Sequence, residues 1–148
     1  MMRATLIPED HVVRMWPRVL PFMERAAEYT YGRYDANDIL DSIVQYNHHL
    51  WVAFTASGEV KGAVVTVFKQ YPKKKCLDLT FVGGDDGLEW KAPMLRMLQH
   101  WARDNECEGI ESSGRLGWGR ALKDDGYKFL WQTYELPVAD TGLGALHG

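Results

Sequence analysis

Residues 76–90 read CLDLTFVGGDDGLEW, and this run contains three successive structural signals. From Cys76 to Val82 apolar and polar residues alternate, which is typical of a strand. The glycine-rich stretch 83–87 ends the alternation, and apolar residues at helical spacing follow from Leu88 to Ala102. A turn between the end of a strand and the start of a helix is a common anion site, because the first helical N–H groups have no partner within the helix. This turn is therefore the first candidate for a ligand site.

The segments around this run predict a mixed sheet. Strands near residues 50–56 and 60–69 are separated by a short turn at Ser57-Gly58, and a second turn leads into the strand 76–82, so the three should form an antiparallel meander. Residues 107–112 come after the helix and should pair in parallel with 76–82. We expect an α+β (α/β) fold in one domain, residues 1–137, followed by a C-terminal tail at 138–148.

The N-terminal part should supply a short strand at residues 3–7 and helices that cover the sheet. Pro17 and Pro21 are expected to interrupt or bend the first helix, since each removes a hydrogen-bond donor. Asp35 is expected to cap the next helix. Between them, Tyr29, Tyr31 and Tyr34 fit a substrate cleft, although partly buried loop tyrosines are commoner.

The C-terminal part predicts one more helix and one more strand. Residues 118–123 have the pattern of a short helix that stops at Asp124-Asp125-Gly126. Residues 127–137 alternate along a last strand, with Phe129 and Trp131 on one face and Leu130 and Leu136 on the other.

Composition and charge exclude several classes of protein. The chain has 148 residues, of which 46% are hydrophobic and 25% charged, as in a folded globular protein. Its net charge of −3 argues against a nucleic-acid partner, which usually selects a basic surface. No apolar run approaches the ~20 residues that cross a bilayer, and the N-terminus has no signal-peptide pattern. We expect no membrane association.

Histidine and cysteine spacing does not predict a metal site. His48 and His49 precede a strand, where adjacent side chains point to opposite faces and cannot chelate one ion. Cys76 and Cys107 each open a predicted strand and are expected to be free thiols of a reducing compartment. No Ser-His-Asp or Cys-His arrangement is suggested by local spacing.

The order of elements, and two local segments, resemble the GCN5-related N-acetyltransferase (GNAT) fold. The segments are residues 51–63, WVAFTASGEVKGA, and residues 120–127, RALKDDGY. The resemblance covers residues 3–136, and the phrasing around Trp118 to Tyr127 resembles small GNAT-like proteins of tailed phages and prophages. Some of those proteins are internal virion components instead of enzymes. The resemblance thus implies a bacterial cytoplasmic location or incorporation in a phage virion, with other proteins, such as virion components, as partners.

In active members of that family the turn holds the pyrophosphate of acetyl-CoA on backbone amides. The resemblance places cofactor binding, if acetyl-CoA binds, at five residues of this chain: Val82, Gly83, Gly84, Gly87 and Leu88. The turn departs from the family pattern because it carries Asp85, Asp86 and Glu89 where a polyanion would lie. Acids there repel a phosphate, and Asp86 and Glu89 also have the spacing of a capping box that satisfies the helix itself.

The family's catalytic positions also differ here. Many members carry a tyrosine as general acid where this chain has Leu122, and Arg115 aligns with a frequent asparagine. Glu111 and Asp78, on the two strands expected to flank a substrate, are the candidates for a general base. We expect a non-catalytic, virion-associated or partner-binding protein that binds acetyl-CoA no tighter than about millimolar. The alternative is an acyl-CoA-dependent N-acetyltransferase with an atypical cofactor loop.

Overall fold

A computed structural model describes residues 2–85, 88–113 and 126–138. Two compact units divide the chain, Met1–Gly114 and Arg115–Gly148, and each is treated separately below. Within the described residues no helix combines the length and apolar character that crossing a membrane requires.

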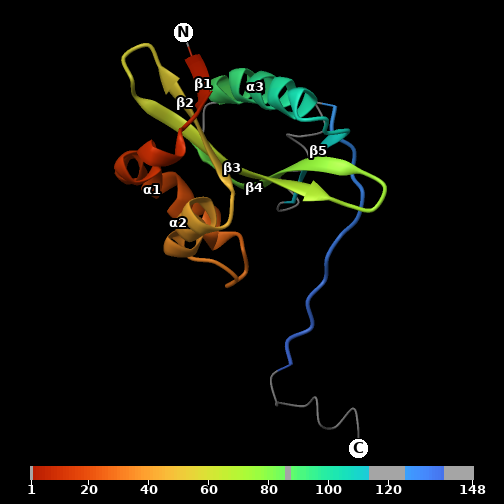
Figure 1. The fold of residues 1–148 in the computed structure, drawn as a ribbon. Coiled ribbons are helices and arrows are strands. Elements are labelled where there is room, and N and C mark those ends of the chain that lie inside the picture. The colour runs from red at the N-terminus through yellow and green to blue at the C-terminus, as the bar shows by residue number, and fades with distance from the viewer. Residues whose placement is uncertain (1, 86–87, 114–125, 139–148) are drawn as a thin grey trace, which may run out of the picture. The chain divides into compact units, whose positions relative to one another are not determined.

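Five strands of the first unit form one mixed sheet in the order β1-β2-β3-β4-β5 (Figure 1). Neighbouring strands from β1 to β4 are antiparallel, while β5 runs parallel to β4. The predicted meander and the parallel crossover are confirmed. The strands are β1 (Met2–Leu6), β2 (His49–Thr55), β3 (Val60–Gln70), β4 (Lys75–Gly84) and β5 (Gly109–Ser112).

Helices cover both faces of this sheet and make two apolar layers. Helices α1 (Val12–Glu28) and α2 (Ala36–Gln45) pack on one face, where Val19, Ile39 and Phe81 are buried. Helix α3 (Lys91–Asp104) packs on the other face, where Trp51, Leu77 and Leu98 are buried. Short 3-10 turns precede two of the helices, η1 (Glu9–His11) before α1 and η2 (Leu88–Trp90) before α3.

Helix α1 corrects one sequence prediction, because Pro17 and Pro21 lie inside a single α-helix instead of interrupting it. Their spacing of four residues puts both on one side of the helix, and both are exposed. A proline leaves a carbonyl of the preceding turn without its helical donor. On the solvent side that carbonyl can bind water, so the helix continues. The opposite side keeps an unbroken apolar stripe that includes Trp16 and Met23.

Helix α2 begins as the sequence predicts. The Asp35 side chain accepts a hydrogen bond from the Asp38 amide at 2.9 Å, and the Asp38 side chain accepts one from the Asp35 amide at 2.9 Å. This reciprocal capping box satisfies two amides at the helix start.

Glycines let both helical layers approach the ends of β3 and β4. A Cβ built on Gly83 would lie 2.3 Å from the Phe22 carbonyl oxygen of α1. On the other face, Cβ atoms on Gly62 and Gly84 would lie 2.6 and 2.4 Å from the ring of Trp90. Gly83 and Gly84 belong to β4, so the strand runs two residues further than the alternation predicts.

The second unit is described at residues 126–138 only. The predicted strand at 127–137 is wrong, because this segment, described by itself, forms neither helix nor strand. A strand requires a hydrogen-bonded neighbour, and residue pattern alone does not supply one. Its large apolar side chains are exposed instead, among them Phe129, Trp131 and Leu136. The predicted helix at 118–123 lies outside the described residues.

We expect Gly83→Ala to lower the free energy of unfolding by about 1–3 kcal/mol, because the new methyl group meets backbone that cannot move aside independently. Gly109→Ala in β5 is the matched control, since its Cβ would meet its nearest atom, Cys76 Sγ, at 3.7 Å. Urea denaturation measures both variants. Equal losses would contradict the proposed close approach of α1 to β4.

Candidate functional site

The pairing of β4 with β5 ends beside an irregularity in β4. Val65 of β3 pairs with Phe81 and the next residue, Thr66, pairs with Leu79, so Thr80 is an extra residue in β4. Pairing of β4 with β5 ends at the same point, with Leu79 opposite Ser112. Beyond it, among the described strands, residues 80–84 of β4 pair only with β3. A bulge of this kind redirects a strand and ends its ladder, and such bulges are common next to active sites.

Asp78 lies one residue before the end of this pairing, on the face of the sheet opposite α3, and it is only 5% exposed. Its Oδ2 accepts a hydrogen bond from Thr80 Oγ1 at 2.8 Å and lies 3.7 Å from Lys69 Nζ. Burial raises the pKa of the Asp78 carboxyl, and the Thr80 hydrogen bond and the Lys69 charge offset part of that rise. The site therefore holds a carboxyl group with increased affinity for a proton.

Glu111 is the register partner of Asp78 across the parallel pair, so both predicted acids project from the same face. Glu111 is half-buried, and its Oε1 accepts a hydrogen bond of 2.6 Å from the Tyr71 hydroxyl. That bond to a carboxylate is the main cause that raises the pKa of Tyr71 to about 12, so the phenol stays protonated and keeps donating. The structure thus brings Asp78 and Glu111 together.

Three further residues of this site were missed by sequence reasoning: Lys69, Tyr71 and Thr80. The register of the β3–β4 hairpin would have placed Lys69 near Asp78, since Val67 is opposite Asp78 and residues two apart share a face. The bulge at Thr80 and the reach of Tyr71 across to β5 depend on tertiary structure. No local sequence pattern predicts the bulge or the contact of Tyr71 with β5.

Tyr34 is the member of the predicted tyrosine group that lies against the sheet. Its ring meets Phe81 edge-on, with centroids 5.1 Å apart. Phe81 is buried on the same face as Asp78, so Tyr34 borders the region of the two acids. Tyr29 and Tyr31 are exposed, and Tyr31 has a positive φ of 56°.

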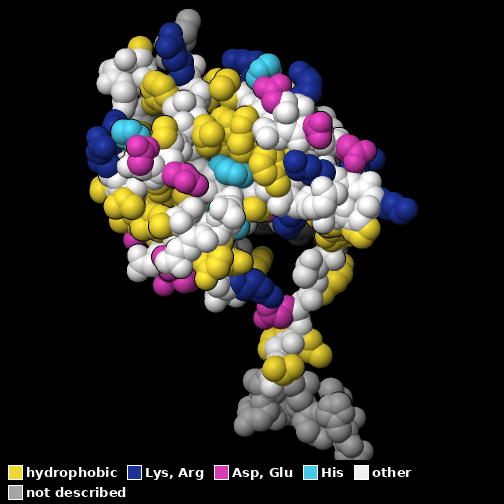
Figure 2. Space-filling view, viewed as in Figure 1, with side chains coloured by type: hydrophobic (Ala, Val, Ile, Leu, Met, Phe, Trp, Pro, Cys, Tyr) yellow, Lys and Arg dark blue, Asp and Glu magenta, His cyan; other side chains and the backbone are white. Residues whose placement is uncertain are grey.

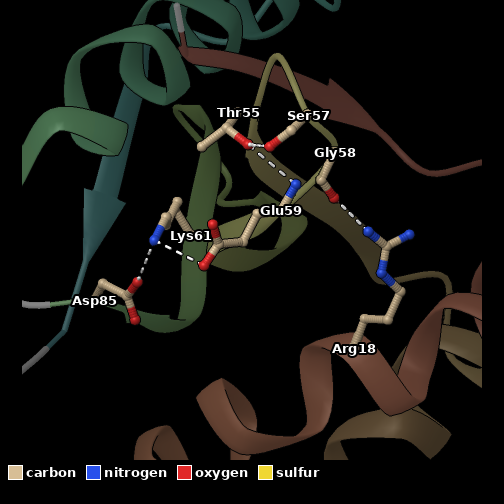
Figure 3. Close-up of polar contacts among 7 residues, drawn as sticks. All are labelled: Arg18, Thr55, Ser57, Gly58, Glu59, Lys61 and Asp85. Atoms are coloured by element: carbon tan, nitrogen blue, oxygen red, sulfur yellow. Dashed lines mark hydrogen bonds and ion pairs between the residues drawn. The ribbon is translucent and has the colours of Figure 1, made fainter.

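The start of the predicted cofactor turn is held by contacts within the chain (Figure 3). The Asp85 amide donates to the Lys61 carbonyl at 2.9 Å, and the Asp85 carboxylate lies 3.4 Å from Lys61 Nζ. Lys61 also binds Glu59 at 3.0 Å, and this hydrogen bond is the main cause that raises the pKa of Lys61. The Asp85 carbonyl accepts from Trp90 Nε1 at 3.2 Å. Lys61 therefore neutralises part of the acidic charge that the sequence places at this turn.

The other predicted cofactor residues are distributed around this point. Val82, Gly83 and Gly84 are the last residues of β4, and Leu88 opens η2. Gly87 lies outside the described residues, as does Asp86, so the predicted capping box between Asp86 and Glu89 is not described. The prediction that the α-helix follows directly from Leu88 is wrong, since α3 begins at Lys91 after the 3-10 turn and its N-cap residue, Trp90, makes no side-chain cap.

Histidines and cysteines do not gather into a metal-binding cluster in the part of the chain that the structure describes. His49 Nδ1 lies 3.1 Å from Thr66 Oγ1, and its ring meets Trp101 of α3. Burial is the main cause that lowers the pKa of His49. Cys76 and Cys107 are both free thiols, as predicted, although β5 begins at Gly109 and Cys107 precedes it.

Comparisons with known proteins identify the fold. No family model matches the sequence, and no curated protein sequence matches it. Solved structures similar to this chain include a probable acetyltransferase, with 14% identity, a TM-score of 0.68 and coverage of 93% of this chain and 99% of the other. A putative acetyl transferase from Pyrococcus furiosus is similar at 15% identity and a TM-score of 0.67, covering 92% of this chain and 100% of the other.

A ribosomal-protein-alanine N-acetyltransferase from Brucella melitensis biovar Abortus 2308 has 14% identity and a TM-score of 0.67, over 93% of this chain and 99% of the other. At these identities the likeness shows a shared architecture. The chain has the GNAT-like α+β fold that the sequence resemblance implies.

We expect Asp78→Asn to raise the free energy of unfolding at pH 7. The pKa of Asp78 is higher in the folded chain than in the unfolded chain. Ionised Asp78 therefore lowers the free energy of unfolding. This loss is fully present above the folded pKa and disappears as the pH falls below the ordinary aspartate pKa. Urea denaturation at pH 7 and near pH 4 measures the difference, with exposed Asp41→Asn on α2 as control. A variant less stable than wild type at pH 7 would contradict net desolvation at this site.

Proposed function

We propose that this chain is an acyl-CoA-dependent N-acyltransferase whose reaction centre lies where the pairing of β4 with β5 ends. The observation that carries the proposal is the coincidence of the Thr80 bulge, the end of β4–β5 pairing at Leu79 and the facing carboxyl groups of Asp78 and Glu111. The similar acetyltransferase structures support it through their fold.

The unpaired side of β4 fits the amide-bearing arm of an acyl-CoA. Among the described strands, residues 80–84 have only β3 as a neighbour, and a ligand that hydrogen-bonds as a strand does would bind along their other side. Val82, Gly83 and Gly84 would hold that arm, and Lys61 is the cation next to the following turn. When bound, the acyl-CoA supplies an acyl thioester that reacts with an amine.

Glu111 is the residue we assign to the amine. Transfer forms a C–N bond, breaks the C–S bond and requires the amine to lose a proton. A half-buried carboxylate can reach that proton, whereas Asp78 is almost fully buried. The Tyr71 hydroxyl holds the Glu111 side chain with its hydrogen bond. Beside Glu111, the Asp78 carboxyl contacts Lys69 and Thr80.

A non-catalytic, partner-binding role is the second candidate, and the predicted turn favours it. The Asp85 amide and carbonyl already have partners within the chain, and amides of this kind are what a pyrophosphate needs. A place in a phage virion stays a prediction from the sequence resemblance.

We expect acetyl-CoA to bind the purified protein with a Kd tighter than about 100 µM in a calorimetric titration, because β4 extends past its pairing with β5. We also expect acetyl transfer to some member of a panel of primary amines. Glu111→Gln should retain acetyl-CoA binding and lower kcat about 100-fold or more, as loss of a general base does. Glu108→Gln is the matched control, because this exposed acid lies one residue before β5.

Each result separates the two candidates. Binding no tighter than about millimolar, with no acetyl transfer, would reject the acyltransferase and favour the partner-binding role. Equal activity of Glu111→Gln and wild type would reject Glu111 as the base while leaving the reaction class intact.

A further inference from the structure

The acyl-CoA donor of the proposed reaction has two chemically distinct parts. Its pantetheine arm carries the thioester and two amide groups, and its nucleotide end carries a pyrophosphate and a further phosphate. An amide-bearing arm binds along strand backbone, whereas phosphates need cations or amides without a partner. The two parts therefore make different demands on the end of β4 and on the turn after it.

The glycines at the end of β4 leave room for the chain itself. In a phosphate-binding turn, glycine lets the ligand approach the backbone closely. Here a Cβ on Gly83 would lie 2.3 Å from the Phe22 carbonyl oxygen, and a Cβ on Gly84 would lie 2.4 Å from the Trp90 ring. Because α1 and η2 already fill the space beside these two glycines, the glycines do not indicate a phosphate site.

The backbone of Asp85, the first residue after β4, is also already bound. Its amide donates to the Lys61 carbonyl at 2.9 Å, and its carbonyl accepts from Trp90 Nε1 at 3.2 Å. A phosphate that used the Asp85 amide would have to displace the hydrogen bond to β3. This amide is therefore a poor donor for a pyrophosphate.

The charges around the turn oppose a polyanion. Lys61 is shared by two carboxylates, those of Glu59 at 3.0 Å and Asp85 at 3.4 Å (Figure 3). Beyond them, η2 carries exposed Glu89 and α3 begins at Lys91. The three acids outnumber the two lysines, so the described part of the turn has a surplus of negative charge that repels phosphate groups.

We propose that this chain recognises its acyl donor by the pantetheine arm and gains no affinity from the phosphates of CoA. Acyl thioesters of pantetheine that carry no nucleotide are then donors as good as acyl-CoA. The side of β4 away from β3 supplies the recognition, at Val82, Gly83 and Gly84. This inference rests on the proposed function, because it concerns the donor of that reaction.

Calorimetric titration of the wild-type protein compares acetyl-CoA with S-acetylpantetheine. We expect acetyl-CoA to bind no more than about threefold tighter than S-acetylpantetheine. Raising NaCl from about 50 mM to about 500 mM should leave the affinity for acetyl-CoA unchanged or increase it, because salt screens repulsion. With one amine acceptor, kcat/KM should agree within about threefold for the two thioesters.

A charge variant tests the turn directly. Glu59→Gln combined with Asp85→Asn leaves Lys61 without its two carboxylates and keeps the backbone contacts of Asp85. This variant should bind acetyl-CoA about threefold tighter or more and bind S-acetylpantetheine as the wild type does. Asp41→Asn, which removes an exposed acid of α2, is the control and should change neither affinity.

The outcomes separate this inference from the function on which it rests. Wild-type binding that is tenfold or more tighter for acetyl-CoA, and that weakens with salt, would overturn the inference and leave the acyltransferase intact. An unchanged affinity of the charge variant for acetyl-CoA would overturn the part assigned to Glu59 and Asp85. If neither thioester binds or transfers its acetyl group, the acyltransferase itself is rejected, and the inference with it.

Discussion

Three glycines at the ends of β3 and β4 set the spacing on which the rest of the first unit depends. Gly83 allows the backbone of α1 to touch β4, and Gly62 with Gly84 allows the Trp90 ring to lie flat on the other face. Because side chains are absent at these positions, two helical layers hold the end of β4 from opposite sides. The end of β4 is therefore held by packing on both faces as well as by β3, its only neighbour there among the described strands.

The acids beside the end of β4–β5 pairing have neighbours that offset part of the cost of burying a carboxyl group. Thr80 and Lys69 both act on Asp78, and Tyr71 acts on Glu111. Burying a carboxyl group costs free energy, whereas burying an apolar side chain at the same place does not. Buried carboxyl groups are therefore commoner where catalysis or recognition needs them. Neighbouring charges also compensate one another at the turn, where Lys61 lies between Glu59 and Asp85 (Figure 3). On the face in Figure 2, side chains of both signs are interspersed in a similar way.

The parts of the fold that rest on local periodicity could be predicted from the sequence. Alternation and short turns located the meander, and the Asp35 cap was visible as a residue pattern. The continuity of α1 through Pro17 could not be predicted from local periodicity, because it depends on which side of the helix meets water. Asp78 and Glu111 could be named as neighbours from strand order, but Tyr71 comes from a turn 40 residues away from Glu111 in sequence. The segment 127–137 shows the limit most clearly, since its pattern predicts a strand and the described segment is not one.

The parallel pairing of β5 also has a consequence for the order in which the chain folds. The strands β1 to β4 are linked by antiparallel pairing, while β5 can reach β4 only after α3 has crossed the sheet. The β4–β5 contact closes a longer loop than the β2–β3 and β3–β4 turns do, so we expect it to form after them, because closing a longer loop costs more entropy. During synthesis, Asp78 is thus on an uncovered sheet edge until β5 arrives. The two carboxyl groups meet only when β5 pairs, so a chain that stalls before this step has the β2–β3–β4 meander and not the pair of acids.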